Sequence, residues 1–317
     1  MVGMRALVAD RGAPGGLAIR NLPEPVPGPD DAVVDVHAIS INRGEVWRLR
    51  AAADGWRPGW DLAGVVRVAA PSGPPAGSRV VGVLAGGSWA ERVAVPGPWL
   101  AELPTGLPFA QAAALPVAGL TALRILRLGP AILGRRVLVT GAAGGVGRLA
   151  VQLAKLGGAE VTAIVSSQER AAGLRELGAA DVVTDLDQLE GEFDLILESA
   201  GGDSLARLAT RVHSEGTLVM FGNSSLAPTT FDVRDVYLGG AVRLQAFTVF
   251  HGFSANPPGP DLGYLAGLVA AGRLDPQVIE VLPWEEIASA LGRLAERKVP
   301  GKLVLTLDRG VPSRTQP

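Results

Sequence analysis

A glycine-rich loop between a strand and a helix constrains this chain more than any other feature. The apolar run RVLVT ends at Thr140, the loop GAAGGVG occupies 141–147, and an apolar helix pattern, GRLAVQLAKL, begins at its last glycine. Glycines let the backbone turn tightly and approach a pyrophosphate, which the free N–H groups and dipole of the helix start then hold. In this context the loop predicts a dinucleotide site formed by Gly144, Gly145, Val146 and Gly147. A glycine-rich turn without a ligand is the alternative.

Strands and helices alternate around this loop. Strands are predicted at 136–141, 160–166, 193–199 and 216–222, and helices over 109–126 (interrupted at Pro116), 145–156, 168–177 and near 203–212. Short Val/Ile/Leu strands alternating with amphipathic helices predict βαβ units and a parallel sheet covered on both faces. Residues 111–250 are therefore expected to form a doubly wound α/β domain of the Rossmann type.

The rest of the chain has a different pattern. Short β segments at 6–9, 32–41, 62–69 and 79–84 alternate with stretches rich in Gly and Pro, which predicts an irregular β-rich domain over 1–110. Two helices, near 261–271 and 284–297, and a last strand at 302–307 are expected to return to it, so 251–317 belongs to the same domain. The stretch 308–317 has no apolar pattern and is expected to fray.

Charge and composition exclude several classes of protein. The net charge is −2 with both signs spread along the chain, so the basic stripe of a nucleic-acid binder is missing. The chain contains no cysteine, which excludes disulfides, thiolate nucleophiles and Cys-ligated zinc. The N-terminus lacks a signal-peptide pattern and no apolar stretch is long enough to span a membrane, so a cytoplasmic location is predicted.

The end of the second Rossmann strand indicates which nicotinamide cofactor is used. NAD sites usually place a carboxylate there to accept hydrogen bonds from the ribose 2′-OH. This chain has Ser166 and Ser167, followed by Arg170, and hydroxyls with a guanidinium suit a 2′-phosphate. The pattern favours NADPH over NADH. Glu169 could partly cancel the charge of Arg170, and a solvated helix residue is the alternative role for Arg170.

The chain resembles the zinc-independent quinone oxidoreductases, the zeta-crystallin-like branch of the medium-chain dehydrogenase/reductase family, along nearly its whole length. The matching segments are ISINRGE (39–45), PGWDLAGVV (58–66), GSRVVGVLAGGSWAE (77–91), AALPVAGLTAL (113–123), the loop region 137–167, ELGAADVV (176–183), ESAGG (198–202) and VPGKLVL (299–305). The resemblance implies a GroES-like substrate domain, a Rossmann domain and a cleft between them. It also implies homodimers or tetramers joined by sheet edges of the cofactor domains, here through 241–250.

Two departures from related enzymes are informative. Zinc alcohol dehydrogenases of the same superfamily carry a Cys where this chain has SINRG and a Gly-His-Glu where it has Gly59-Trp60-Asp61. Without a Lewis acid, alcohol oxidation is disfavoured, and hydride addition to an electron-poor acceptor is expected instead. Related NADPH enzymes also often carry a Tyr near the 2′-phosphate, where this chain has Thr184 or Asp185, and a Lys where it has Arg170. This second departure weakens the preference for NADPH.

The resemblance assigns residues around the reacting groups. Asn42 is expected beside the nicotinamide, where its amide could donate to a substrate carbonyl and stabilise the anion that grows as hydride arrives; pinning a turn is the alternative. Trp47, Trp60, Trp89 and Phe250 are expected to bind a flat substrate, with core packing as the ordinary alternative for each Trp. Thr121 and Lys302 are expected to contact the cofactor, and helix packing is the alternative for Thr121. Asp61 is expected to make a structural hydrogen bond, with a role as an acid as the alternative, and no convincing general acid is evident.

Together these residues predict an enzyme that reduces a quinone or activated enone with NADPH and without metal. Its expected partners are a small, planar, electron-poor substrate and a second copy of the chain, and neither nucleic acid nor membrane. An ene reductase of a polyketide or other secondary-metabolite pathway is an alternative, because enoyl-reductase modules of polyketide synthases resemble the same family. A cofactor-binding protein with little turnover is another.

Overall fold

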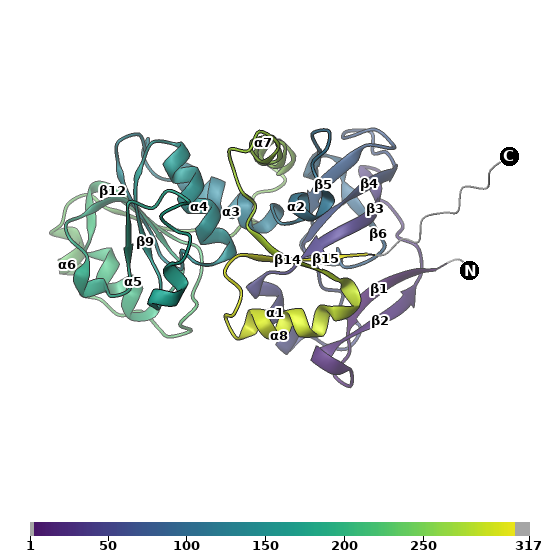
Figure 1. Ribbon diagram of the computed structural model, residues 1–317, viewed down its shortest axis with the longest axis horizontal. Coiled ribbons are helices and arrows are strands. Elements are labelled where there is room, and N and C mark those ends of the chain that lie inside the picture. Colours follow the sequence, from purple (N-terminus) through teal and green to yellow (C-terminus); the bar gives the residue numbers. More distant parts are fainter. Residues whose placement is uncertain (1–2, 308–317) are drawn as a thin grey trace. The chain divides into compact units, whose positions relative to one another are not determined.

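The computed structural model describes residues 3–307, and the stretch 308–317 lies outside them. The chain divides into two units (Figure 1). Unit 1 comprises the chain up to Val117, Phe253–Ala271 and the part from Val278 onward, and unit 2 comprises Ala118–Gly252 and Gly272–Gln277.

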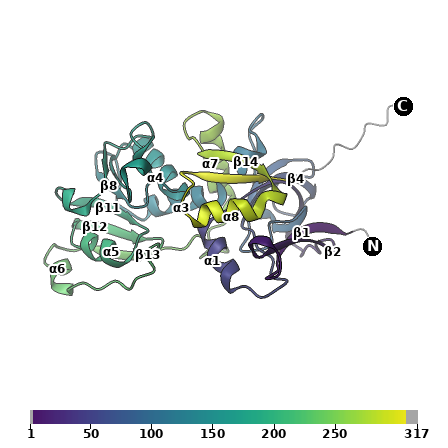
Figure 2. The same cartoon turned by 60° about the horizontal axis from the view of Figure 1, so that its bottom comes forward.

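Unit 2 is built on one parallel sheet. Its strands are β8 (Arg136–Val139), β9 (Glu160–Ile164), β10 (Asp181–Val183), β11 (Phe193–Glu198), β12 (Val212–Met220) and β13 (Arg243–Ala246). They lie in the order β10-β9-β8-β11-β12-β13, and every pairing is parallel. Figure 2 shows β8, β11, β12 and β13 following one another across this sheet. Counted from β8, this is the doubly wound order 3-2-1-4-5-6, in which ligands bind at the carboxyl ends of the strands.

The helices of unit 2 cover this sheet. They are α3 (Pro116–Arg127, which begins in unit 1), α4 (Gly145–Leu156), α5 (Gly202–Ala209) and α6 (Val233–Tyr237). Helix α4 packs on β8 and β9, and α5 packs on β12. A core of Leu138, Ile196, Phe193, Leu208 and Leu218 lies between sheet and helices.

Unit 1 is built on a second, mostly antiparallel sheet. Its strands are β3 (Asp31–Ser40), β4 (Asp61–Val68), β5 (Arg79–Val83), β6 (Arg92–Pro96), β7 (Leu100–Glu102), β14 (Val278–Pro283) and β15 (Lys302–Thr306), beside a separate hairpin of β1 (Met4–Ala9) and β2 (Leu17–Leu22). The order is β14-β15-β3-β4-β5-β7, with β6 pairing β3. Strand β15 pairs antiparallel with β3 and brings the C-terminal part of the chain beside Ser40.

Four helices lie within unit 1: α1 (Arg43–Ala51), α2 (Phe109–Ala113), α7 (Gly259–Ala270) and α8 (Ile287–Ala295), as far as residues 3–307 describe it. Trp89 and Trp284 are buried in its apolar core. Short single-turn helices complete the described chain: η1 (Pro14–Gly16), η2 (Gly97–Trp99), η3 (Gln168–Ala171), η4 (Leu186–Gln188) and η5 (Trp284–Glu286).

These elements confirm the α/β class, with a parallel sheet in one unit and a β-rich second unit. The break predicted at Pro116 separates α2 from α3, and α4 spans the residues predicted for it. The predicted helix over 168–177 is wrong. Only the turn η3 forms, because Ala172 is extended (φ −55°, ψ 130°) and Gly173 has a left-handed φ of 77°. Helix α1 was not predicted.

Candidate active site

The glycine loop of unit 2 connects β8 to α4 as the sequence predicts. Gly141 takes a left-handed φ of 59°, a conformation that costs glycine little, and the N–H of Gly144 donates to Gly141 O at 2.9 Å. This closes a tight turn at the carboxyl end of β8. Gly144, Gly145 and Val146 are partly exposed there.

Gly147 allows α4 to start against this turn. A Cβ at residue 147 would lie 2.4 Å from Gly141 O and 2.6 Å from Ala142 Cα, so any side chain would push the helix away. The helix begins at Gly145, directly after Gly144, and no side chain of the described residues caps its first N–H groups. Unsatisfied N–H groups and the positive end of the helix dipole attract an anion, so the loop fits a pyrophosphate.

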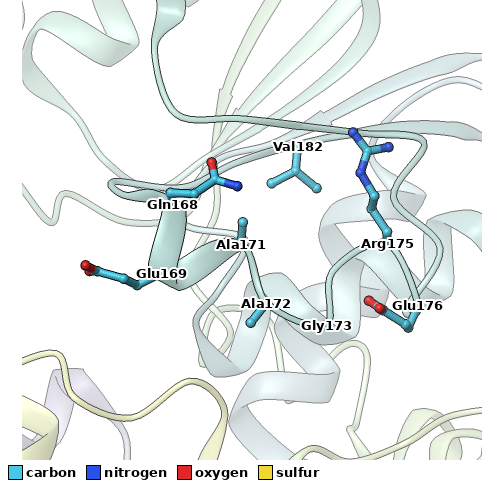
Figure 3. Close-up of a pocket in the computed structure, with 8 residues that line it drawn as sticks. All are labelled: Gln168, Glu169, Ala171, Ala172, Gly173, Arg175, Glu176 and Val182. Atoms are coloured by element: carbon cyan, nitrogen blue, oxygen red, sulfur yellow. The ribbon is translucent and has the colours of Figure 1, made fainter.

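The segment that follows β9 borders a surface cavity of about 360 Å³. The cavity is lined by residues of 168–176 and by Val182, and in Figure 3 the Gln168 amide points towards Val182 while the Glu169 carboxylate points away. Ser166 is exposed, and the Ser167 hydroxyl lies 3.4 Å from Glu169 Oε2. Hydroxyl groups therefore lie at the strand end where a carboxylate would accept hydrogen bonds from a ribose.

Glu198 lies at the end of β11, which pairs with β8, and it was not singled out from the sequence. It is fully buried at the end of β11 and accepts hydrogen bonds from Ala200 N (2.9 Å), Gly201 N (3.0 Å) and Ser204 Oγ (3.0 Å). A buried carboxylate needs such donors. The ESAGG pattern at 198–202 was the available signal for this turn.

In unit 1, Asp61 is the centre of a buried polar cluster. Its Oδ1 accepts from Val117 N at 2.9 Å, and its Oδ2 accepts from Asn42 Nδ2 at 2.8 Å and from the Ser40 hydroxyl. Lys302 Nζ lies 3.3 Å from the same oxygen, and both side chains are buried. The predicted structural hydrogen bonding of Asp61 is confirmed.

Lys302 balances the charge of Asp61. Its Nζ also donates to Asn42 Oδ1 at 2.7 Å and to Ile41 O at 3.2 Å, so three acceptors surround an ammonium that is only 3% exposed. An ammonium has three N–H donors, and these partners match that number. The predicted contact of Lys302 with the cofactor stays a prediction.

Asn42 joins this cluster to Glu45. Its Nδ2 donates to Asp61 and, at 3.2 Å, to Glu45 Oε2, which also accepts from Asn42 N at 2.7 Å. Asn42 precedes α1 and Glu45 is the third residue of that helix, so the Glu45 side chain reaches back to its start. The Asn-x-x-Glu spacing was the sequence signal for this pair, and the pair was not predicted.

Glu45 is buried and its Oε1 atom has no hydrogen-bond partner among the described residues. Burial raises the pKa of Glu45 well above its ordinary value, and the negative charge of Asp61 raises it further. The hydrogen bonds from Asn42 and the charge of Lys302 act in the opposite direction without cancelling this. The cluster therefore pairs a charged Asp61–Lys302 couple with a carboxyl group that favours its neutral form.

The other residues predicted to contact the substrate or the cofactor are divided between unit 1 and unit 2. Trp47 is 43% exposed with Arg50 over its ring, whereas Trp60 is buried beneath Arg48. Trp89 is 1% exposed within the apolar core, which favours packing over a ligand contact. Thr121 (buried, on α3) and Phe250 (half-buried) lie in unit 2.

Two further observations concern metal ions and membranes. Within 3–307, no three or more His, Asp or Glu side chains are grouped so that they could hold a metal ion. None of the helices described there combines the length and apolarity that crossing a membrane requires.

Comparison with known families identifies relatives along the chain. A family model described as zinc-binding dehydrogenase matches residues 163–305. The chain is 29% identical to a probable zinc-binding mitochondrial oxidoreductase of Arthroderma benhamiae, over 91% of this chain and 92% of that one. It is also 32% identical, over 88% of its length, to a segment that makes up 13% of the spectinabilin polyketide synthase system protein NorB of Streptomyces orinoci.

Solved structures share this fold. The quinone oxidoreductase from Coxiella burnetii is 26% identical, with a TM-score of 0.81 over 97% of this chain and 100% of that one. A mycobacterial protein solved in complex with NADPH is 25% identical, with a TM-score of 0.83 over 96% of this chain and 99% of that one. With the strand order of unit 2 and its glycine loop, these likenesses agree with the resemblance seen in the sequence. The chain belongs to the medium-chain dehydrogenase/reductase family of oxidoreductases, in its zeta-crystallin-like quinone oxidoreductase branch.

Proposed function

We propose that this protein reduces a quinone or an activated enone with NADPH and without a metal ion. The observation that carries the proposal is the uncapped start of α4 behind the 141–147 loop, where only glycine fits at residue 147. Gly144, Gly145, Val146 and Gly147 would hold the pyrophosphate. When bound, the cofactor supplies a hydride to the acceptor.

The choice of NADPH rests on the end of β9. Ser166 is exposed there, and no carboxylate occupies the position of Ser166 or Ser167. We infer that these hydroxyls and Arg170 bind the 2′-phosphate, which a carboxylate at the same place would repel. The similar mycobacterial structure solved with NADPH supports this choice.

Asn42 would orient the carbonyl of the acceptor. Asp61 keeps Ser40, Val117 N and Lys302 as partners if the Asn42 amide turns one N–H towards a substrate. The ammonium 2.7 Å from Asn42 Oδ1 polarises the amide and strengthens its N–H donors. Such a donor stabilises negative charge that develops on the carbonyl oxygen.

A metal-free reaction is consistent with the groups in unit 1. The chain has no cysteine, and the buried carboxylate of Asp61 already has Lys302 as its counter-charge. A hydride acceptor that is electron-poor needs no Lewis acid to activate it, unlike an alcohol. We propose Trp47 and Trp60 in unit 1 and Phe250 in unit 2 as contacts of a flat substrate, and Thr121 and Lys302 as contacts of the cofactor.

We further propose a homodimer formed through unit 2. Strand β13 is the outer strand of its sheet and all its residues are exposed. Exposed apolar side chains lie in the chain before and within it, at Val233, Tyr237, Leu238 and Leu244. An open strand edge with apolar neighbours suits pairing with a second copy. The cytoplasmic location stays a prediction from the N-terminal sequence.

The test is consumption of NADPH by the purified protein with 9,10-phenanthrenequinone and with 2-cyclohexenone, with NADH in parallel. We expect turnover of at least one acceptor with NADPH and little with NADH. Tight NADPH binding without turnover of either acceptor would favour a cofactor-binding protein. Failure to bind either nucleotide would refute the proposal.

An enoyl reductase is the second candidate, because the chain is 32% identical to part of a polyketide synthase protein. A short 2-enoyl thioester distinguishes the two. If the thioester is reduced with a kcat/KM about tenfold or more above that of the quinone, a pathway enzyme is favoured.

A further inference from the structure

The side chain of Arg148 is a buried cation that forms no ion pair with any residue of 3–307. Arg148 lies in the first turn of α4 and is only 7% exposed. Its guanidinium donates to Gln277 Oε1 at 2.9 Å and to Ala172 O at 2.6 Å, and its Nε has no hydrogen-bond partner among the described residues. Both partners are neutral. Among the residues that the structure describes, no carboxylate oxygen lies within ion-pair distance of this guanidinium.

This arrangement costs free energy in the absence of an anion. Burial lowers the pKa of the Arg148 guanidinium, and the neighbouring positive charge of Arg170 lowers it further, while Asp275 opposes these effects. An arginine nevertheless stays protonated in proteins. A buried charge that keeps only neutral partners is destabilising, and it attracts an anion more strongly than an exposed charge does.

The Arg148 guanidinium binds the segment of the chain that follows β9. Ala172, whose carbonyl Arg148 binds, and Gly173 both line the cavity of about 360 Å³ that Figure 3 shows. A Cβ at residue 173 would lie 3.3 Å from Nη1, so the glycine leaves the guanidinium without a side-chain neighbour there. The same segment starts directly after Ser166 and Ser167. Arg148 and Arg170 thus bring two positive charges to one strand end.

We propose that Arg148 is a specificity-determining residue that supplies, with Arg170, the positive charge for the 2′-phosphate of NADPH. The inference rests on the proposed use of NADPH. It assigns to the first turn of α4 a second task beside holding the pyrophosphate. Binding of the phosphate would give the buried guanidinium a negative partner within ion-pair distance.

The competing explanation is a structural tether, in which Arg148 only joins Ala172 to Gln277. Arg136 offers a matched control because it is such a tether on β8. Its guanidinium donates to Glu192 O and Glu190 O, both at 2.8 Å, and stacks on the Phe193 ring. These contacts lie at the start of β8, and the glycine loop follows the end of that strand.

The experiment is calorimetric titration of the full-length protein with NADPH and NADH, for the wild type, Arg148→Met, Arg148→Lys and Arg136→Met. We expect Arg148→Met to weaken NADPH binding about tenfold or more and NADH binding less than about twofold. Arg148→Lys should restore part of the preference. Arg136→Met should lower the thermal midpoint and leave the ratio of the two affinities unchanged.

Equal losses of NADPH and NADH affinity in Arg148→Met, or no loss, would overturn the inference in favour of the tether. If Arg148→Met does not fold, the affinity ratio of Arg148→Lys and the displacement of NADPH by 2′,5′-ADP against 5′-AMP decide in the same way. A wild type that binds neither nucleotide, or prefers NADH, refutes the proposed cofactor itself. The wild-type titration therefore separates that failure from a failure of the Arg148 assignment.

Discussion

At the scale of single residues, the buried Asp61–Lys302 pair predicts a large effect on stability. Replacing Lys302 by Met leaves the carboxylate of Asp61 buried without its counter-charge. We expect the free energy of unfolding to fall by about 3–5 kcal/mol, measured by urea denaturation. Lys298→Met is the control, since Lys298 pairs with Glu296 at the surface and should change stability by less than about 0.5 kcal/mol. Asp61→Asn should recover part of the loss in the Lys302→Met background, and no recovery would contradict this account.

Glu45 predicts a dependence of stability on pH. Its pKa is raised in the folded state, whereas in the unfolded chain it is about 4.3. Above that value the unfolded state loses the proton while the folded state keeps it, so rising pH favours unfolding until the folded pKa is passed. The stability that the neutral Glu45 carboxyl contributes is fully present below its pKa in the unfolded chain, and it declines as pH rises above that value. Glu45→Gln removes this titrating group. The free energy of unfolding of the variant should therefore increase relative to that of the wild type as pH rises from about 4 to about 8.

The measurement is the free energy of unfolding of both proteins, obtained by urea denaturation across that pH range. A folded-state pKa that is higher by one corresponds to about 1.4 kcal/mol of this free energy. Glu176→Gln, at an exposed position, serves as the control and should follow the wild type. Parallel curves for wild type and Glu45→Gln would show that Glu45 is ionised in the folded protein.

At the scale of elements, α4 depends on close approach to the turn after β8. Gly147→Ala would place a Cβ 2.4 Å from Gly141 O, so the helix must shift away from the loop. We expect NADPH affinity to fall about tenfold or more and stability to fall by about 1–3 kcal/mol. Gly267→Ala in α7 is the same change where nothing lies within 4 Å, and it should stabilise by up to about 1 kcal/mol. Retained NADPH affinity in Gly147→Ala would mean that the loop does not hold the pyrophosphate.

Some of these elements could be predicted from the sequence and others could not. The β8–loop–α4 unit could be predicted because its glycines, apolar strand and apolar helix are consecutive in the chain. The sequence wrongly predicted a helix over 168–177, because its composition does not show the tertiary contact that overrides helix propensity there. Arg148 binds Ala172 O, and Gly173 takes a left-handed φ. The polar cluster was missed for a related reason. Lys302 and Asn42 are 260 positions apart, and only the pairing of β15 with β3 brings them together.

At the scale of the whole molecule, the open edge of unit 2 predicts assembly of two copies. Leu238 is 76% exposed and Val233 and Tyr237 are exposed in α6, shortly before the outer strand β13. A symmetric dimer presents the same surface twice, so one charged substitution introduces two charges into the contact. Leu238→Asp should therefore shift the protein from dimer to monomer in sedimentation equilibrium at micromolar concentrations. Leu133→Asp, at a comparably exposed leucine of the same unit, should leave the dimer intact. A wild type that sediments as a monomer, or a Leu238→Asp variant that stays dimeric, would show that copies of this chain do not associate through this surface.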